Sequence, residues 1–134
     1  MNFGDIFSQW ESRYGVYDKD AEAEDADTKI ASALRRKYLR AKRPDSIIDI
    51  HGMTRDEAAL ALEHFFENAR RERHEKILVI HGKGNHSAGD AVLKIFTKDF
   101  IERCPFAGES GYAGAAGGGS GATWVLLKLT VPGK

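Results

Sequence analysis

The hydrophobic pattern of residues 46–51 is that of a strand, and it changes to a helical pattern soon after Gly52. The run is rich in β-branched side chains and ends at this glycine. Thr54 and Glu57 then stand at capping-box spacing, and apolar residues three or four positions apart continue to about Arg73. We therefore expect a strand that ends in His-Gly, followed by a capped helix.

The same order of elements is repeated in the next part of the chain. Residues 76–81 form a continuous apolar run that is typical of a strand buried on both faces, and this run also ends in His-Gly. A second capping pattern begins at Ser87 and predicts a helix that ends near Cys104. Its expected buried face consists of Val92, Phe96 and Phe100. A strand, helix and strand in this order predict a parallel, right-handed unit.

The last third of the chain is rich in glycine, since seven of the 14 glycines fall within residues 108–121. This composition predicts a loop, with a short strand near Gly111. Residues 122–130 alternate in the manner of a further strand. The expected fold is therefore α/β, a two-layer β-α-β-α-β-β sandwich with a mixed four-stranded sheet, and an N-terminal helical extension precedes it.

Charges are unevenly placed in the first 45 residues. Residues 18–27 hold six acids and one lysine, whereas residues 29–43, which we call the basic arm, hold seven cations and no acid. Apolar residues at helical spacing predict that the basic arm is a helix with one apolar stripe and one basic face. A short amphipathic helix is expected ahead of it, from Phe3, Ile6, Phe7 and Trp10. We divide the chain into an extension, residues 1–45, and a domain, residues 46–131.

Composition narrows the class of protein. The 134 residues carry 20 cationic and 20 acidic side chains, so the net charge of zero argues against indiscriminate coating of nucleic acid. No apolar run reaches the roughly 18 residues of a membrane helix, and we expect no membrane partner. An acid near the start disfavours a secretion signal, and one cysteine cannot form an intramolecular disulfide. These features predict a cytoplasmic location.

Two histidines and one acid lie at the ends of the first two predicted strands. Residues two apart in a strand point to the same face, so Asp49 and His51 should be neighbours. Parallel strands present their carboxyl ends at one edge of the sheet, where His81 is expected to join this pair. A structural, hydrogen-bonded histidine is the alternative for either ring taken alone.

Glycine-rich segments are candidate phosphate-binding loops. Gly82, Lys83 and Gly84 precede a predicted helix, and glycines allow backbone amides to approach an anion closely. A tight structural turn is the alternative here. Residues 117–122 could likewise contact a ligand, or only allow close packing. The chain has neither a Walker A loop nor a dinucleotide-binding glycine motif, and no set of residues has metal-ligand spacing.

Three motifs in order resemble the small MutS-related (Smr) domain family, in its stand-alone bacterial form. They are Ile48-Asp49-Ile50-His51-Gly52, then His81-Gly82-Lys83-Gly84, then Gly118-Gly119-Ser120-Gly121-Ala122, and the match spans about residues 46–130. The resemblance implies a fold similar to the C-terminal domain of a bacterial translation initiation factor. It also implies an association with nucleic acids, as in nucleases that nick DNA or cut RNA.

We therefore expect an endonuclease that acts on RNA or on branched or structured DNA. Its predicted catalytic residues are Asp49, His51 and His81, which would exchange protons near neutral pH. Its predicted phosphate-binding residues are Gly82, Lys83, Gly84, Gly118, Gly119, Gly121, Arg35, Arg36, Lys37 and Arg40. No cofactor is required on RNA, where the 2′-hydroxyl is the nucleophile, whereas DNA would call for a divalent cation, Mg²⁺ or Mn²⁺.

Two other functions compete with this one. The same loops could grip phosphates in a nucleic-acid-binding module that cuts nothing. Alternatively, residues 1–45 could dock the domain onto a protein or ribosome partner. In each case we expect a monomer.

Overall fold

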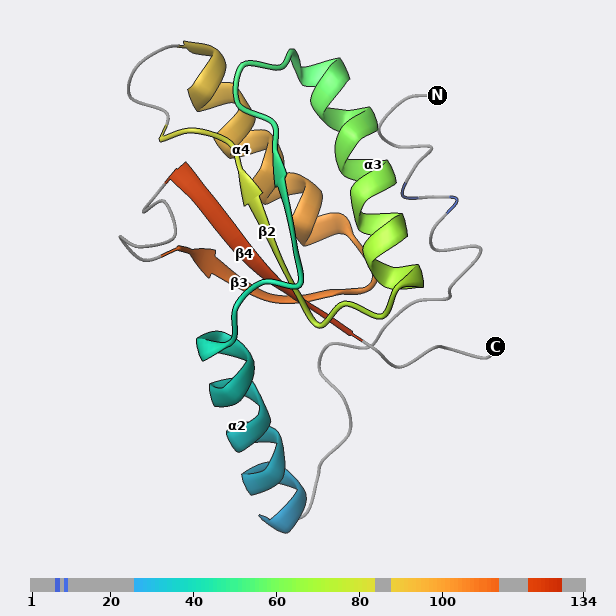
Figure 1. The fold of residues 1–134 in the computed structure, drawn as a ribbon, viewed down its shortest axis with the longest axis vertical. Coiled ribbons are helices and arrows are strands. Elements are labelled where there is room, and N and C mark those ends of the chain that lie inside the picture. Colours follow the sequence, from blue (N-terminus) through green and yellow to red (C-terminus); the bar gives the residue numbers. More distant parts are fainter. Residues whose placement is uncertain (1–6, 8, 10–25, 84–87, 114–120, 129–134) are drawn as a thin grey trace.

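The computed structural model describes residues 7, 9, 26–83, 88–113 and 121–128. Its elements are, in order, α2 (Ala26–Ala41), β1 (Ser46–Asp49), α3 (Arg55–Arg71), β2 (Lys76–Ile80), α4 (Ala88–Arg103), β3 (Ala107–Tyr112) and β4 (Ala122–Leu127). The four strands form one mixed sheet in the order β1-β2-β4-β3 (Figure 1). Strands β1 and β2 are parallel, while β4 is antiparallel to both of its neighbours. The predicted α/β class and the mixed four-stranded sheet are confirmed.

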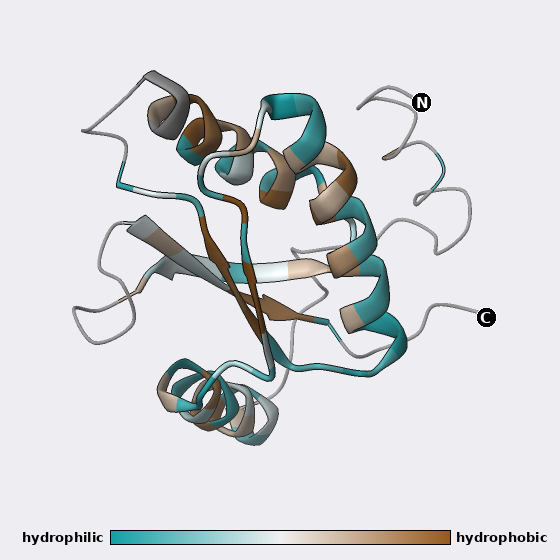
Figure 2. Cartoon of the chain, turned by 45° about the horizontal axis from the view of Figure 1, so that its top comes forward, coloured by the Kyte–Doolittle hydropathy of each residue, from teal (hydrophilic) through white to brown (hydrophobic). Residues whose placement is uncertain are grey.

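Helices α3 and α4 cover the same face of the sheet, which we call the helix face (Figure 2). The core between the two layers is built from fully buried side chains, and the Phe66 and Phe100 rings meet there with centroids 5.1 Å apart. The predicted capping box is present, since the Thr54 hydroxyl accepts from the Glu57 amide at 3.1 Å and Glu57 accepts from the Thr54 amide at 2.9 Å. Local capping and buried packing thus agree on where α3 begins.

Strand β3 confirms the short strand predicted near Gly111, but it begins earlier than expected, at Ala107. A Cβ atom added to Gly111 would lie 2.9 Å from the indole of Trp124, its partner in the ladder. One added to Gly108 would lie 3.2 Å from the Leu126 carbonyl oxygen. The glycines of this segment therefore allow close packing within a strand.

The buried face of α4 also differs from the expected one. Phe96 and Phe100 are buried as predicted, but Val92 is 46% exposed. Leu93 and Ile101 are buried instead. At the start of the helix the buried residue is therefore Leu93 and not Val92, and the two side chains are about 100° apart around the helix axis.

Phe7 belongs to the core of the domain. It is buried, and its ring centroid lies 5.2 Å from that of Phe100. Phe3, Ile6 and Trp10, which were predicted to share its helix, lie outside the described residues. Phe7 is therefore used within the chain, and this removes it from the surface predicted to dock a partner.

Helix α2 is attached to the sheet through its C-terminal end. Leu39 is its one buried residue, and the buried ammonium of Lys76 donates to the carbonyl oxygens of Arg40 and Lys42 at 2.7 Å each. A cation is favourable there because the last carbonyls of a helix lack partners and carry partial negative charge. Burial lowers the pKa of Lys76 from its ordinary value.

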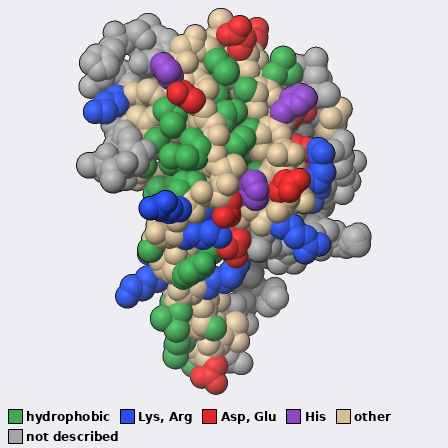
Figure 3. All heavy atoms as spheres, in the orientation of Figure 1, with side chains coloured by type: hydrophobic (Ala, Val, Ile, Leu, Met, Phe, Trp, Pro, Cys, Tyr) green, Lys and Arg blue, Asp and Glu red, His purple; other side chains and the backbone are tan. Residues whose placement is uncertain are grey.

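The apolar stripe predicted for the basic arm is present but does not pack against the domain. Ile30, Leu34 and Tyr38 are all exposed, and apolar side chains follow the length of the projecting helix in Figure 3. The face that meets the domain is held by ion pairs instead. Glu75 accepts from Arg35 and Lys42, and these bonds hold the pKa of Glu75 below its usual value although burial opposes them.

Candidate functional site

Asp49 and His51 form an exposed pair at the carboxyl end of β1. The Asp49 Oδ1 atom lies 2.7 Å from Nδ1 of His51 and also accepts the His51 backbone N–H at 3.0 Å. The two side chains are 50% and 64% exposed. The structure thus places together the two residues that the strand pattern assigned to one face.

The hydrogen bond determines how the His51 ring is protonated. A carboxylate can only accept, so Nδ1 carries the proton and Nε2 is the basic nitrogen of the neutral ring. Partial burial of Asp49 raises the pKa of its carboxyl, but the hydrogen bonds from His51 and its charge outweigh this and hold the pKa below the usual value. The pair therefore joins an ionised carboxylate to an imidazole oriented as a base.

Gly52 turns the chain immediately after this pair. Its φ of +84° lies in the region that L side chains rarely adopt, and the Met53 amide donates back to the Ile50 carbonyl oxygen at 3.1 Å. No atom lies within 4 Å of the position that a Cβ would take on Gly52. Backbone conformation, and not lack of space, is thus the reason for a glycine here.

His81 lies at the same edge of the sheet but on the other face. Asp49 is paired with Ile80 across the parallel ladder, so His81, one residue later, points to the opposite side. There the imidazole is 0% exposed. The expectation that His81 joins Asp49 and His51 in one cluster is wrong, because the register offsets the two histidines by one residue.

Both ring nitrogens of His81 are engaged. Nδ1 lies 2.7 Å from the Gly82 carbonyl oxygen, and Nε2 lies 2.8 Å from Oγ1 of Thr123 in β4. Because a carbonyl only accepts, Nδ1 carries the proton and the neutral ring accepts at Nε2 from the Thr123 hydroxyl. Proton exchange between His81 and a substrate does not fit this buried position. Thr123 gave no signal in the sequence beyond its place in a strand.

The two glycine-rich segments meet beside His81. The Gly121 carbonyl oxygen accepts from the amides of His81 and Gly82 at 2.9 and 3.0 Å, and a Cβ on Gly121 would lie 3.2 Å from Cγ of Lys83. The Gly82 amide, which was predicted to bind phosphate, is thus already used in a backbone hydrogen bond. Lys83 is exposed. Gly84, Gly118 and Gly119 lie outside the described residues.

The predicted phosphate-binding residues of the basic arm fall into two groups. Arg35 pairs with Glu75, and Arg40 pairs with Glu109, each at 2.8 Å. Arg36 and Lys37 are exposed, and within the described part of the chain neither lies at ion-pair distance from a carboxylate. Arg35 and Arg40 therefore fasten the helix to the domain, whereas Arg36 and Lys37 are available to an anion.

The described residues contain neither a cluster of metal ligands nor a membrane-spanning helix. No three side chains from His, Cys, Asp and Glu are grouped where they could hold a metal ion in residues 26–83, 88–113 and 121–128. None of the described helices is long and apolar enough to cross a membrane.

This fold and the motifs at its edge define a class of α/β domain with a mixed sheet and paired His-Gly strand ends. The Smr domain model matches residues 48–128, which is more than half of the chain. The chain belongs to the Smr domain family.

Relatives and solved structures agree with this assignment. The chain is 41% identical over 128 residues to an uncharacterized protein of Treponema pallidum and 38% identical over 81 residues to endonuclease MutS2 of Carboxydothermus hydrogenoformans. It spans 63% of the first protein and 10% of the second, and the aligned parts are 90% and 60% of this chain.

Two crystal structures share the fold. The Smr domain of Thermus thermophilus MutS2 is similar over 62% of this chain and 98% of that domain, with a TM-score of 0.56 and 26% identity. YdaL, a stand-alone small MutS-related protein from Escherichia coli, is similar over 81% of each chain, with a TM-score of 0.63. At 21% identity the likeness to YdaL concerns the fold alone.

Proposed function

We propose that this chain binds nucleic acid and cleaves phosphodiester bonds, with Asp49 and His51 as its acid–base pair. The observation that carries the proposal is the 2.7 Å hydrogen bond between an ionised carboxylate and an exposed imidazole at the carboxyl edge of the sheet. Ligands of open α/β sheets bind outside this edge. Membership in a family that includes the Smr domain of MutS2 endonucleases supports the choice of substrate.

On RNA the pair acts on the 2′-hydroxyl. His51 takes the hydroxyl proton at Nε2, and Asp49 stabilises the imidazolium that forms. The 2′-oxygen bonds to phosphorus, the bond to the 5′-oxygen breaks, and the leaving oxygen takes up a proton from water. The products are a 2′,3′-cyclic phosphate and a free 5′-hydroxyl. This route uses a nucleophile within the substrate and needs no cofactor.

Cleavage of structured DNA by the same site requires a different nucleophile. Water must attack, and a divalent cation such as Mg²⁺ or Mn²⁺ would activate it, with Asp49 as the carboxylate ligand that the site offers. The site offers one carboxylate and one histidine, which does not suit a two-metal mechanism. RNA is therefore the favoured substrate, because its 2′-hydroxyl is the nucleophile.

Three of the other predicted residues, Lys83, Arg36 and Lys37, bind the substrate in this scheme. Lys83 follows β2 next to the end of β1 and is exposed, so its ammonium can balance the charge on the phosphate. Arg36 and Lys37 add electrostatic attraction from α2. His81 is a positioning residue in this scheme, since it holds Thr123 and the two glycine-rich segments without meeting the substrate.

The test is cleavage of a single-stranded RNA, its 2′-deoxy counterpart and a branched DNA, each with and without EDTA. Asp49→Asn and His51→Ala should each slow cleavage by about 10²- to 10⁴-fold, which is the usual contribution of general acid–base catalysis. His64→Ala is the matched control, because His64 is an exposed histidine of α3 away from the strand ends. Unchanged rates in the folded Asp49 and His51 variants would contradict the proposal.

A binding module without catalysis is the second candidate. It is favoured by Arg36 and Lys37, which are exposed on a helix that projects from the domain, since such a helix offers positive charge without a reactive group. Tight binding of all three nucleic acids, with none of them cut under any condition, would select this function. Arg36→Gln with Lys37→Gln should then weaken binding and reduce its dependence on salt.

A further inference from the structure

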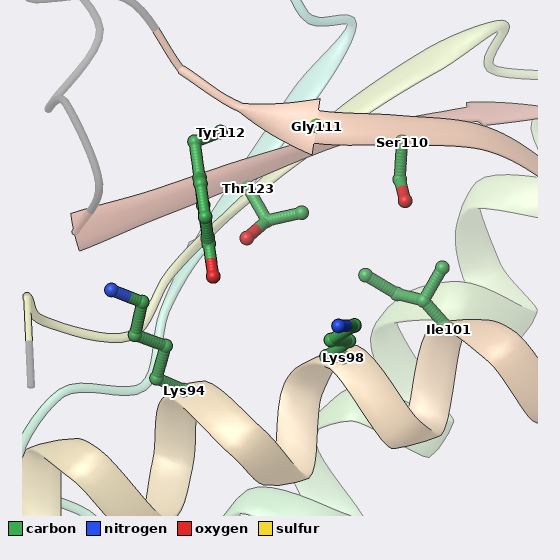
Figure 4. A pocket seen from close by; sticks show the side chains of 7 residues that line it. All are labelled: Lys94, Lys98, Ile101, Ser110, Gly111, Tyr112 and Thr123. Carbon is green, nitrogen blue, oxygen red and sulfur yellow. The ribbon is translucent and has the colours of Figure 1, made fainter.

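A cavity of about 180 Å³ lies between α4 and the ends of β3 and β4, on the helix face. Ser110, Tyr112 and Thr123 line it from the sheet, and Lys94 and Lys98 line it from α4 (Figure 4). The register places the three sheet residues on one face, because Ser110 is paired with the buried Val125 and Tyr112 with Thr123. Their side chains point toward α4 (Figure 4).

The cavity is positively charged. Lys94 and Lys98 are one helical turn apart, and none of the described residues that line the cavity is acidic. Across the described residues, neither lysine lies at ion-pair distance from a carboxylate. Like charges at this spacing destabilise a helix, and an anion between them would remove that repulsion.

Contacts with neutral groups hold the residues that line the cavity in place. The Lys94 ammonium lies 4.8 Å from the centroid of the Tyr112 ring and donates to the Lys83 carbonyl oxygen at 3.2 Å. Ser110 and Tyr112 bring hydroxyl groups that can donate to an anion. Thr123 is held by its hydrogen bond to the buried His81 ring. The cavity is therefore braced by the same histidine that the strand pattern had placed in the catalytic cluster.

We propose that this cavity binds a phosphate group, with Lys94 and Lys98 supplying its counter-charge. Pockets for whole small molecules usually measure about 300–1,000 Å³, so this smaller cavity suits one group of a longer ligand. The proposal rests on the proposed function for the source of that phosphate, which is the backbone of a nucleic-acid strand. A free nucleotide or inorganic phosphate is the other source of the same chemistry.

The position of the cavity at the edge of the sheet supports a nucleic-acid strand as the source of the phosphate. At the carboxyl edge of β1 and β2, the order of strands places His51 first, then Lys83, then Thr123 and last Tyr112. Neighbouring strands are about 4.8 Å apart, so the edge from β1 to β3 extends over roughly 14 Å. The Asp49–His51 pair and the cavity lie at this edge on opposite faces of the sheet, so a nucleic-acid strand that crosses the edge can reach both.

The test compares three proteins by fluorescence anisotropy with labelled single-stranded RNA and DNA at several salt concentrations. Lys94→Gln with Lys98→Gln should weaken binding at least about tenfold and lower the slope of log affinity against log salt by roughly 1.4, for two lost charges. The control is Arg71→Gln with Arg73→Gln, which removes two exposed charges at and just after the C-terminal end of α3. Neither residue lines the cavity. The control should keep both affinity and slope.

Equal affinity and slope for the Lys94/Lys98 variant and the wild-type protein would overturn the cavity proposal and leave the proposed function intact. If the wild-type protein binds neither strand, the proposed function fails, and the cavity is tested separately by titrating inorganic phosphate and a nucleoside monophosphate. Backbone amide shifts at Ser110 and Tyr112 that disappear in the Lys94/Lys98 variant would assign the cavity to a free phosphate compound. Absence of such shifts would overturn the cavity proposal as well.

Discussion

The carboxyl ends of β1 and β2 carry the same local pattern, a strand followed by histidine and a glycine with positive φ, yet the two histidines have opposite surroundings. Gly52 and Gly82 have φ values of +84° and +93°. His51 is exposed and bonded to Asp49, whereas His81 is buried and bonded to Thr123 and to a carbonyl oxygen. One motif therefore supports two different roles.

The difference follows from the position of each histidine relative to the ladder. In β1 the histidine is two residues after Asp49, which is paired with Ile80, while in β2 the histidine immediately follows Ile80. Because side chains alternate between faces, this offset of one residue sends His81 toward the helix face. Solvent exposure, and with it access to a substrate, is decided by register more than by residue type.

Replacing His81 should have the largest effect on stability. His81→Ala leaves a cavity and removes the partner of Thr123, so the free energy of unfolding should fall by about 2–4 kcal/mol. His51→Ala should lower it by less than about 1 kcal/mol, because the side chain is exposed. Urea unfolding of the two variants measures the contrast. Equal losses of unfolding free energy in the two variants would contradict a buried His81 and an exposed His51.

Thr123→Val should have the next largest effect. The variant keeps the shape of the side chain but removes the hydroxyl that donates to Nε2 of the buried His81, which costs about 1–3 kcal/mol. Thr123→Ser keeps the hydroxyl and loses one methyl group, so its cost should be close to 1 kcal/mol. A lower free energy of unfolding for Thr123→Ser than for Thr123→Val would argue against the hydrogen bond.

Gly52→Ala tests the turn at the exposed strand end. A left-handed backbone costs an L residue about 1–2 kcal/mol, and no steric contact is added because the space around Gly52 is open. Gly52→Asn should cost less, since asparagine tolerates this conformation better. The unfolding free energies of the two variants, measured together, separate strain from crowding. A larger loss for asparagine would contradict a purely conformational cost.

The smallest effect concerns the pH dependence of the exposed pair. The folded-state pKa of Asp49 lies below its usual value, so the pair contributes stability above the unfolded pKa of about 3.9 and loses it as pH falls through the folded pKa. Both groups are half exposed or more, which limits the contribution to less than about 1 kcal/mol. A carboxyl-carbon NMR titration should show the Asp49 midpoint moving up in His51→Ala. An unmoved midpoint would contradict the pairing.

Much of this fold can be predicted from local signals. The capping box at Thr54, the apolar run of β2 and the pairing of Asp49 with His51 depend on neighbours in the sequence, and each is present. The environment of His81 depends on the ladder register and on Thr123, 42 residues away, and neither is visible in a local pattern.

Two further features depend on long-range contacts. Strand β3 exists because its glycines accommodate Trp124 and the β4 backbone, although glycine by itself disfavours strands. The basic arm was correctly predicted as a helix, but the cations that fasten it to Glu75 and Glu109 could not be told from those that face solvent. Both depend on residues that are distant in the sequence.

The most direct test is the reactivity of the two imidazoles toward diethyl pyrocarbonate at neutral pH, read residue by residue by mass spectrometry. His51 should be modified quickly in the folded protein and protected by a saturating 2′-O-methyl RNA that cannot be cleaved. His81 should react only as fast as the protein unfolds, whether or not RNA is present. Equal modification of His51 and His81 in the folded protein would contradict the assignment of one exposed, working histidine and one buried, positioning histidine.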